Sequence, residues 1–435
     1  MVQDPGYAAA GGRWSAAGRQ PGPEIRRLGP RPLPLHLAMA ALSWTVSQAA
    51  LPRSRNGSPP WSPLTGEAAR ALNARLAEAD PEALAEAVAG EALKRHHALI
   101  DGIAAYRGHP YRRVLSEPPA VWSEGSTRLL DYGAMPAAPS QTGGLPVLVV
   151  PSLINRAYIL DLSARTSLLR WLVGRGFRPL LVDWDRPGAP ERRFTLSDYI
   201  CGRLEGCLDA ALSLTGRPPV LLGYCMGGLL TLALALRREA DLAGLALLAT
   251  PWDFHAGGLA QARLAAALYG SFAPAAEPLG ELPVDVVQAF FAGLDPQLVL
   301  RKFSAFGRLD PASREAVDFV ALEDWLNDGV PLAAPVAREC LVEWYGENAT
   351  ARGRWRIAGR PVEPAALDLP SLCLVPAQDR IVPPESAAAL ASAIPGAVTR
   401  TPATGHIGMV VSARARRQVW QPLAAWLEER ATAVG

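Results

Sequence analysis

The sequence has 435 residues, of which 49% are hydrophobic, and a formal net charge of +2. This length and apolar content allow a large core in an α/β protein, whereas the near-neutral charge excludes nucleic-acid binding by bulk electrostatics. Five scattered cysteines, with no apolar leader at the N-terminus, favour a reducing cytoplasm over a disulfide-rich secreted protein.

The first third of the chain divides into two predicted regions. Residues 1–34 are rich in Pro, Gly and Arg, and we expect them to be disordered. Residues 35–125 form an α-helical N-terminal region, in which a linker at 52–64 separates an apolar helix at 35–51 from Ala- and Leu-rich helices. The apolar helix is too short and too polar to span a bilayer, so we expect no transmembrane segment.

From residue 126 onward, short apolar runs alternate with helix-like segments. A buried strand is expected at 145–152, followed by strands at 177–184, 219–224 and 242–250 in the first part of a core, 126–255. Further strands are expected at 369–377 and 397–403 in its second part, 367–435. Such alternation predicts a mostly parallel, doubly wound sheet with helices on both faces. The insert at 256–366 lacks the alternation, and its scattered aromatic residues indicate a helical cap.

The stretch "LLGYCMGGLL" at 221–230 reads as a strand, a sharp turn and the start of a helix. This is the context of the nucleophile elbow of the α/β-hydrolase fold, with Cys225 in place of the usual serine. Gly223 and Gly227 relieve crowding where strand and helix approach, and the helix N-terminus stabilises a thiolate. A motif this short is also compatible with simple small-residue packing.

Two further residues complete a predicted triad. Asp379 follows a late strand in "LVPAQDRIVPPES", and His406 follows the last strand in "ATGHIGMVV". Alone, each is compatible with an ordinary turn aspartate or surface histidine. Nucleophile, acid and base occur in the chain order of α/β-hydrolases, each after a strand, which favours a catalytic Cys225–His406–Asp379 triad.

An oxyanion hole is expected from backbone N–H groups. The first donor is Met226, which follows the nucleophile, and the second is Leu153 or Ile154 in the loop after the first long strand. The remaining histidines lack the spacing of metal ligands, so we assign no metal and no cofactor. The sequence does not identify the substrate-binding residues.

The thiol suggests which reaction the triad performs. A thiolate that attacks a thioester forms another thioester, so the acyl group stays activated and can be passed to a hydroxyl group. Acyl transfer from a CoA thioester to an alcohol therefore fits this nucleophile, and hydrolysis by the same triad remains an alternative.

Several separated motifs resemble those of polyhydroxyalkanoate synthases, most closely the class III catalytic subunit. They are "VLVVPSLINRAYILDL", "LLVDWDRPG", "FTLSDYI", "LLGYCMGG", "LATPWDFH", "PAQDRIVPPESA" and "GHIGMVVSARA", whereas "AYRGHPYRR" at 105–113 resembles the class I enzymes. The resemblance implies an acyltransferase that polymerises (R)-3-hydroxyacyl-CoA, with 3-hydroxybutyryl-CoA as the expected substrate, and releases CoA. It implies Cys225 as the chain-carrying nucleophile, His406 as the base and Asp379 as the third member.

The resemblance also implies partners. These are the acyl-CoA, the growing polyester, the surface of a storage granule in the cytoplasm, and either a second copy of the chain or a partner synthase subunit. Two other functions compete with it: a cysteine-dependent hydrolase, such as an acyl-CoA thioesterase or polyester depolymerase, and a non-catalytic granule protein. The second would require a broken triad, and all three residues are present.

Overall fold

The computed structural model describes residues 27–55, 66–135 and 143–434. Within these ranges eight strands form one sheet in the order β1-β2-β4-β3-β5-β6-β11-β12. Neighbouring strands from β4 to β12 are parallel, and the pairs β1–β2 and β2–β4 are antiparallel. The strands are β1 (Ala120–Glu124), β2 (Thr127–Asp131), β3 (Pro146–Val150), β4 (Arg178–Asp183), β5 (Val220–Tyr224), β6 (Gly244–Leu248), β11 (Ser371–Leu374) and β12 (Val398–Arg400).

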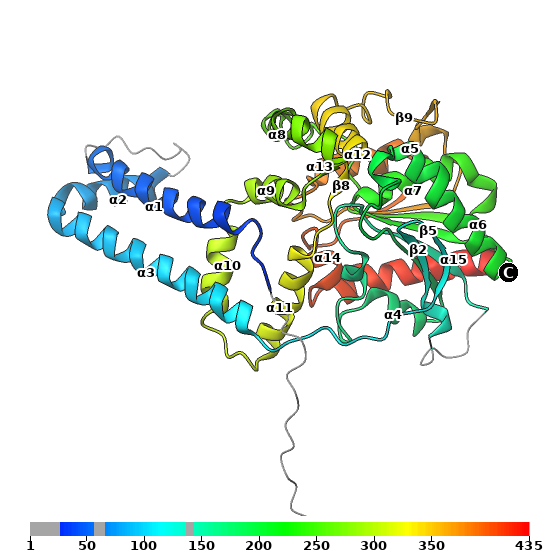
Figure 1. Ribbon diagram of the computed structural model, residues 1–435, viewed down its shortest axis with the longest axis horizontal. Helices are drawn as coiled ribbons and strands as arrows, with labels where there is room; N and C mark the ends of the chain where they lie inside the picture. The colour runs from blue at the N-terminus through cyan, green and yellow to red at the C-terminus, as the bar shows by residue number, and fades with distance from the viewer. Residues whose placement is uncertain (1–26, 56–65, 136–142, 435) are drawn as a thin grey trace, which may run out of the picture.

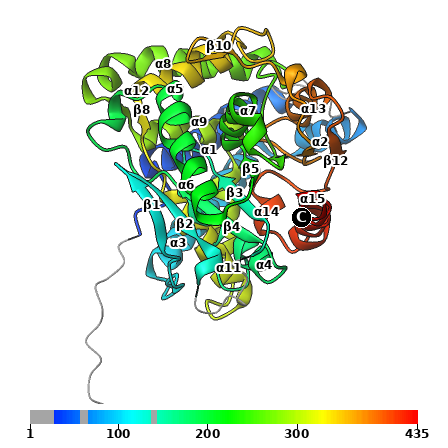
Figure 2. The same ribbon diagram turned by 90° about the vertical axis from the view of Figure 1, so that its right-hand side faces the viewer.

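The central strands are continuous apolar runs because helices cover both of their faces. Every residue of β3, β5 and β6 is buried. Helices α6 (Glu205–Thr215) and α7 (Met226–Arg238) pack on one face, and α4 (Leu168–Val173) and α15 (Gln421–Val434) pack on the other (Figure 2). The predicted mostly parallel, doubly covered sheet is confirmed.

The sheet begins earlier than the sequence suggested. The core was expected to start at residue 126, but β1 at Ala120–Glu124 already pairs with β2 through the turn at Gly125, whose φ is 57°. Its two-residue separation from β2 makes a tight hairpin. Residues 119–125 thus belong to the sheet and not to the helical region before it.

The insert after β6 is built mainly of helices that lie above the carboxyl ends of the strands (Figure 1). Short ladders accompany them, β7 (Glu281–Leu282) with β8 (Leu332–Ala333) and β9 (Arg356–Ile357) with β10 (Arg360–Pro361). The helices are α8 (Leu259–Leu279), α9 (Val284–Leu294), α10 (Leu298–Phe306), α11 (Arg314–Asn327) and α12 (Ala334–Arg338).

The N-terminal helices form an arm that projects from the body (Figure 1). They are α1 (Leu33–Arg55), α2 (Gly66–Glu78) and α3 (Pro81–Gly108). The arm joins the cap where α3 crosses α10, and the approach is close because a Cβ on Gly102 would lie 2.0 Å from the backbone oxygen of Phe303. Within the described ranges, none of the helices combines the length and apolar character needed to cross a bilayer.

Part of the segment expected to be disordered is packed in the structure. Residues 1–26 lie outside the described residues, as do residues 56–64 of the expected linker, whose residues 52–55 belong to α1. Residues 27–34 are described, and Arg27 is buried among α3, α11 and the chain that follows α3. The segment predicted to be disordered up to residue 34 therefore contains packed residues. Its Pro- and Gly-rich composition does not predict ion pairs to distant helices, and these pairs hold it in place.

Candidate active site

Cys225 occupies the sharp turn between β5 and α7. Its backbone has φ 56° and ψ −128°, a conformation that costs a residue other than glycine on the order of 1–3 kcal/mol. The neighbouring strand holds it there, since the Cys225 N–H donates to the Leu248 oxygen of β6 at 2.8 Å. This is the strained turn that the elbow motif predicted.

The glycines around Cys225 are required by close contacts on both sides of the turn. A Cβ on Gly223 would lie 2.4 Å from the Gly228 Cα, and one on Gly227 would lie 2.1 Å from the Val150 oxygen. A Cβ on Gly228 would meet the Thr250 hydroxyl at 1.8 Å. Packing α7 directly against β3, β5 and β6 thus leaves room only for glycine at these positions.

The structure brings Asp379 and His406 together across 27 positions of sequence. The His406 Nδ1–H donates to Asp379 Oδ2 at 2.7 Å, and the Asp379 side chain is fully buried. Asp379 Oδ1 accepts from the N–H groups of Ile381 and Val382 at 2.8 and 2.9 Å. Both carboxylate oxygens are therefore bonded within the protein, and they fix the tautomer of His406 that leaves Nε2 free for Cys225.

Electrostatics favour a protonated His406. Burial alone would lower the pKa of His406, but the charge of Cys225, hydrogen bonds to Asp379 and Cys225, and the charge of Asp379 raise the pKa to about 10. The hydrogen bond to Cys225 places the ring next to the nucleophile. The three residues predicted from their chain order therefore lie in one hydrogen-bonded row; their catalytic roles stay a prediction.

Tyr224 is a neighbour of the triad that sequence reasoning did not assign to the site. Its ring stacks on the His406 ring, with centroids 5.3 Å apart and an interplanar angle of 29°. Its hydroxyl donates to the His406 backbone oxygen at 3.2 Å. These contacts hold one face of the imidazole, and nothing in the local pattern "GYCMG" indicated them, because they join residues 182 positions apart.

The predicted oxyanion donors lie beside Cys225 but differ in what they bind. Met226 is the first residue of α7, so its N–H has no acceptor within the helix. The Ile154 N–H donates to the Ser152 hydroxyl at 3.1 Å, and that hydroxyl lies 3.9 Å from the Met226 sulfur. Ile154 could bind an oxyanion only after exchanging this partner, so its role and that of Leu153 stay predictions.

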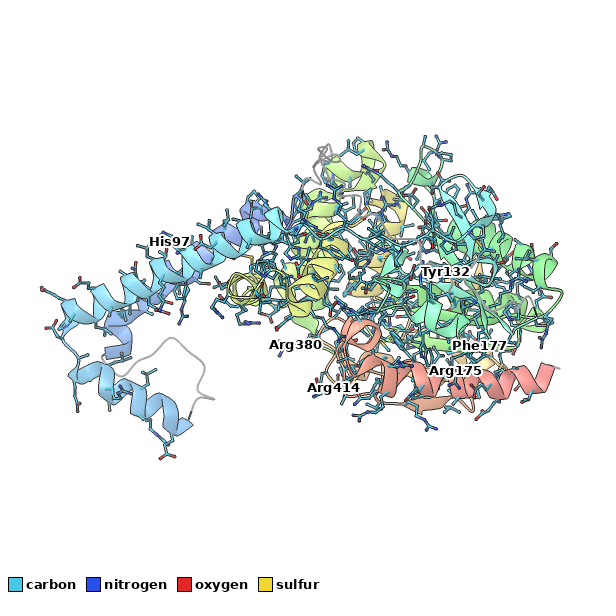
Figure 3. All side chains as sticks on the ribbon, turned by 90° about the horizontal axis from the view of Figure 1, so that it is seen from below. His97, Tyr132, Arg175, Phe177, Arg380 and Arg414 are labelled. Atoms are coloured by element: carbon cyan, nitrogen blue, oxygen red, sulfur yellow. The ribbon has the colours of Figure 1, made fainter. Side chains whose placement is uncertain are left out.

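A cavity of about 290 Å³ opens in front of the triad. Its walls come from the elbow, the loop after β3, the cap helices and, unexpectedly, residues of the N-terminal segment. Arg380, which lines its rim, lies on the side of the body that faces the arm (Figure 3). Representative lining residues are Cys225, His406, Ile154, Phe291, Trp325 and Pro30.

The five cysteines are all free thiols, and across the described residues His, Cys, Asp and Glu side chains do not gather in threes as a metal site requires. Cys207 and Cys340 are buried, and burial raises the pKa of both thiols. Cys225 is partly exposed and lines the cavity, so it is the thiol that the geometry presents to a substrate.

Comparisons with known families agree with this arrangement. The family described as alpha/beta hydrolase fold matches residues 146–413, which confirms the predicted fold. The family described as the poly-beta-hydroxybutyrate polymerase (PhaC) N-terminus matches residues 119–172. The second match begins with β1, in agreement with the start of the sheet seen here.

Three curated relatives share the name poly(3-hydroxyalkanoate) polymerase subunit PhaC. The chain is 31% identical to the protein from Synechocystis over 66% of its own length and 78% of the relative. It is 30% identical to the protein from Haloferax mediterranei over 71% and 63%, and 28% identical to the one from Allochromatium vinosum over 73% and 89%. The match thus spans less than two thirds of the Haloferax protein.

Proposed function

Since this chain belongs to the family of poly(3-hydroxyalkanoate) polymerase subunits, we propose that it transfers 3-hydroxyacyl groups from CoA thioesters to a growing polyester through Cys225. The observation that carries the proposal is the strained cysteine at the end of β5, hydrogen-bonded to a histidine that Asp379 orients. A cysteine here keeps the acyl group as a thioester, which an alcohol can still attack.

The first step loads the enzyme. His406 holds the proton of Cys225, as the raised pKa of the imidazole favours, and the thiolate attacks the carbonyl carbon of the acyl-CoA. The tetrahedral oxyanion is stabilised by the Met226 N–H and by a second donor from the loop after β3. When the C–S bond to CoA breaks, His406 returns the proton to the departing thiolate, and the acyl group remains on Cys225.

The second step lengthens the chain. His406 takes the proton from the 3-hydroxyl of an incoming acyl-CoA, and the oxygen attacks the thioester on Cys225. An ester bond forms, the C–S bond breaks, and the thiolate of Cys225 takes the proton back. The lengthened acyl-CoA then reloads Cys225 as in the first step and releases CoA.

Acylation prepares His406 for this second role. The charge of Cys225 is the largest of the contributions that raise the pKa of the imidazole. A thioester carries no such charge, so burial lowers the pKa of His406 with less opposition once the chain is loaded. The ring is then closer to neutral and can accept the proton of the hydroxyl.

Asp379 acts through His406 and not on the substrate. One of its oxygens binds the imidazole, the other binds two backbone N–H groups, and the side chain is fully buried. An incoming hydroxyl would have to displace one of these partners to reach the carboxylate. The arrangement supports the orienting role of the acid in a triad.

The cavity favours transfer over hydrolysis because its walls are largely apolar. Water competes with the hydroxyl for the thioester, and a dry site suppresses that side reaction. We propose (R)-3-hydroxybutyryl-CoA as the substrate, the granule surface in the cytoplasm as the place of action, and a second copy or a partner synthase subunit as the associate. The names of the relatives, which are subunits, support the last point.

The test is to incubate the purified protein with 3-hydroxybutyryl-CoA and with a longer 3-hydroxyacyl-CoA, measuring CoA release and the acyl product. We expect CoA release with insoluble polyester, and neither from the Cys225→Ala variant. Release of CoA with only free 3-hydroxy acid would identify a hydrolase instead. Absence of release with both substrates, alone and with an added synthase partner subunit, would refute the proposal.

A further inference from the structure

One wall of the catalytic cavity comes from the beginning of the described chain. We call residues 27–36 the strap. Pro30, Arg31 and His36 of the strap line the same cavity as Cys225 and His406. In Figure 1 the strap is the dark-blue segment that runs from the start of α1 toward α11.

The strap is anchored at its first residue by a buried guanidinium. Arg27 forms a two-bonded ion pair with Asp324 of α11, at 2.7 and 3.1 Å, and its side chain is 4% exposed. The same group donates to the backbone oxygens of His109 and Tyr111, which follow α3. Loss of the Asp324 partner would leave the buried charge of the Arg27 guanidinium unpaired, which is strongly destabilising.

Further anchors lie next to the cavity, and they fit the strap to the last turn of α11. The Arg31 N–H donates to the Asn327 Oδ1 at 2.7 Å, and the Asn327 amide donates to the Glu323 backbone oxygen at 2.7 Å. A Cβ on Gly29 would lie 2.4 Å from the Asn327 Cγ. The Arg31 side chain pairs with Asp285 of α9.

Among the described residues, the strap faces both the cavity and solvent: Pro30 lines the cavity and is buried, whereas Leu28, two residues earlier, is 59% exposed. The bonds named above go to the arm and to the cap, so the strap can leave without breaking the sheet or the triad. Leu33 packs on the apolar cluster between α3 and α10, and the other named anchors are polar, unlike the apolar packing that holds β5 and α7.

The cavity of about 290 Å³ cannot hold a polyester of many units. A chain that grows on Cys225 must therefore leave the cavity, and it passes out beside one of the walls.

We propose that the strap is that wall: it closes the acyl cavity while the first units are added, and it is displaced by the growing polyester, which leaves between α11 and the start of α1. This inference rests on the proposed function, and it adds a product-exit gate to it. The strap becomes a positioning element for short acyl chains and an obstacle to long ones.

The first test measures the strap in the unaltered protein. Cys225 is loaded from CoA thioesters of one or of three 3-hydroxybutyrate units, and hydrogen exchange of residues 27–36 is followed by mass spectrometry. Intact mass reports whether the acyl-enzyme forms. We expect the Arg31 amide, bonded to Asn327, to stay protected with one unit and to exchange at least tenfold faster with three, whereas the amides of β5 stay protected in both.

The second test closes the gate. Gly29→Cys with Asn327→Cys places two thiols in contact, and the disulfide is formed by mild oxidation; wild-type protein oxidised in the same way reports any damage to Cys225. The locked protein should release CoA in the first turnovers and then stop, and reduction should restore elongation. Arg314→Ala, which removes an exposed ion pair on α11 remote from the strap, should leave elongation unchanged.

The outcomes separate the two proposals. Unchanged protection of the strap with three units, or normal polymer formation by the locked protein, would overturn the exit gate while the synthase function stands. Loss of the first acylation in the locked protein would also overturn it, because the strap would then control entry of the substrate. Failure of the unaltered protein to form any acyl-enzyme would refute the proposed function, and the gate with it.

Discussion

The role of Asp379 can be decided by the change Asp379→Asn. In the structure Oδ1 accepts from two backbone N–H groups, so the amide oxygen of Asn must take that position. The amide NH2 then faces His406 Nδ1, and two donors cannot bond each other. His406 must therefore move its proton to Nε2, the nitrogen that should accept the proton of Cys225.

The wrong tautomer blocks both proton transfers to His406. The same change in a serine-protease triad lowers kcat about 10⁴-fold, which corresponds to about 5 kcal/mol at about 1.36 kcal/mol per factor of ten. We expect a loss of about 10³- to 10⁴-fold in the loading of Cys225 and an equal loss in chain elongation, with little change in folding, since the side chain keeps its shape.

The assay separates the two steps. Rapid-quench measurement of CoA release in the first turnover reports loading, and polymer formation from a pre-loaded acyl-enzyme reports elongation. Loading at the wild-type rate combined with a collapse of elongation would refute the orienting role, because it would mean that the carboxylate acts directly on the substrate hydroxyl. A loss of less than tenfold in both steps would refute the triad itself.

Three other predictions test the site. Cys225→Ala should abolish the acyl-enzyme detected by intact mass, whereas Cys207→Ala, at a buried thiol away from the cavity, should keep more than about a tenth of the activity. Activity of the Cys225→Ala variant would exclude a covalent thioester on Cys225. In the same Cys225→Ala protein, the pKa of His406 should fall below its value of about 10, because the charge and the hydrogen bond of Cys225 that raise it are gone; an unchanged NMR titration of the imidazole would contradict the thiol–imidazole contact. Gly227→Ala should lower the free energy of unfolding by about 3 kcal/mol or more, because the new methyl group clashes with a backbone oxygen of β3. Gly90→Ala, in an open position of α3, should raise the free energy of unfolding by up to about 1 kcal/mol. Equal urea midpoints for the two variants would refute the close packing of the elbow.

The sequence determined those parts of the molecule whose signals are local. Buried parallel strands require continuous apolar runs, and these runs placed β3 to β6 and β11 within a few residues of their observed bounds. The edge strand β12 is exposed, and it was located by its place between two helices. The elbow also has a local cause, because a tight approach of helix and strand tolerates only small residues. The chain order of Cys225, Asp379 and His406 then predicted their meeting, since the carboxyl ends of parallel strands share one edge of the sheet.

Only the tertiary structure decided which side chains surround that row. Tyr224 stacks on a histidine 182 positions away, and this contact has no periodic or compositional signal. Residues 27–34 show the same limit, because their Pro- and Gly-rich sequence predicts disorder, whereas the Arg27 guanidinium is buried against the carboxylate of Asp324, 297 positions later in the chain. Local composition predicts only the conformation that a segment adopts by itself. The interactions that order residues 27–34 come from residues that lie near them only after the chain has folded.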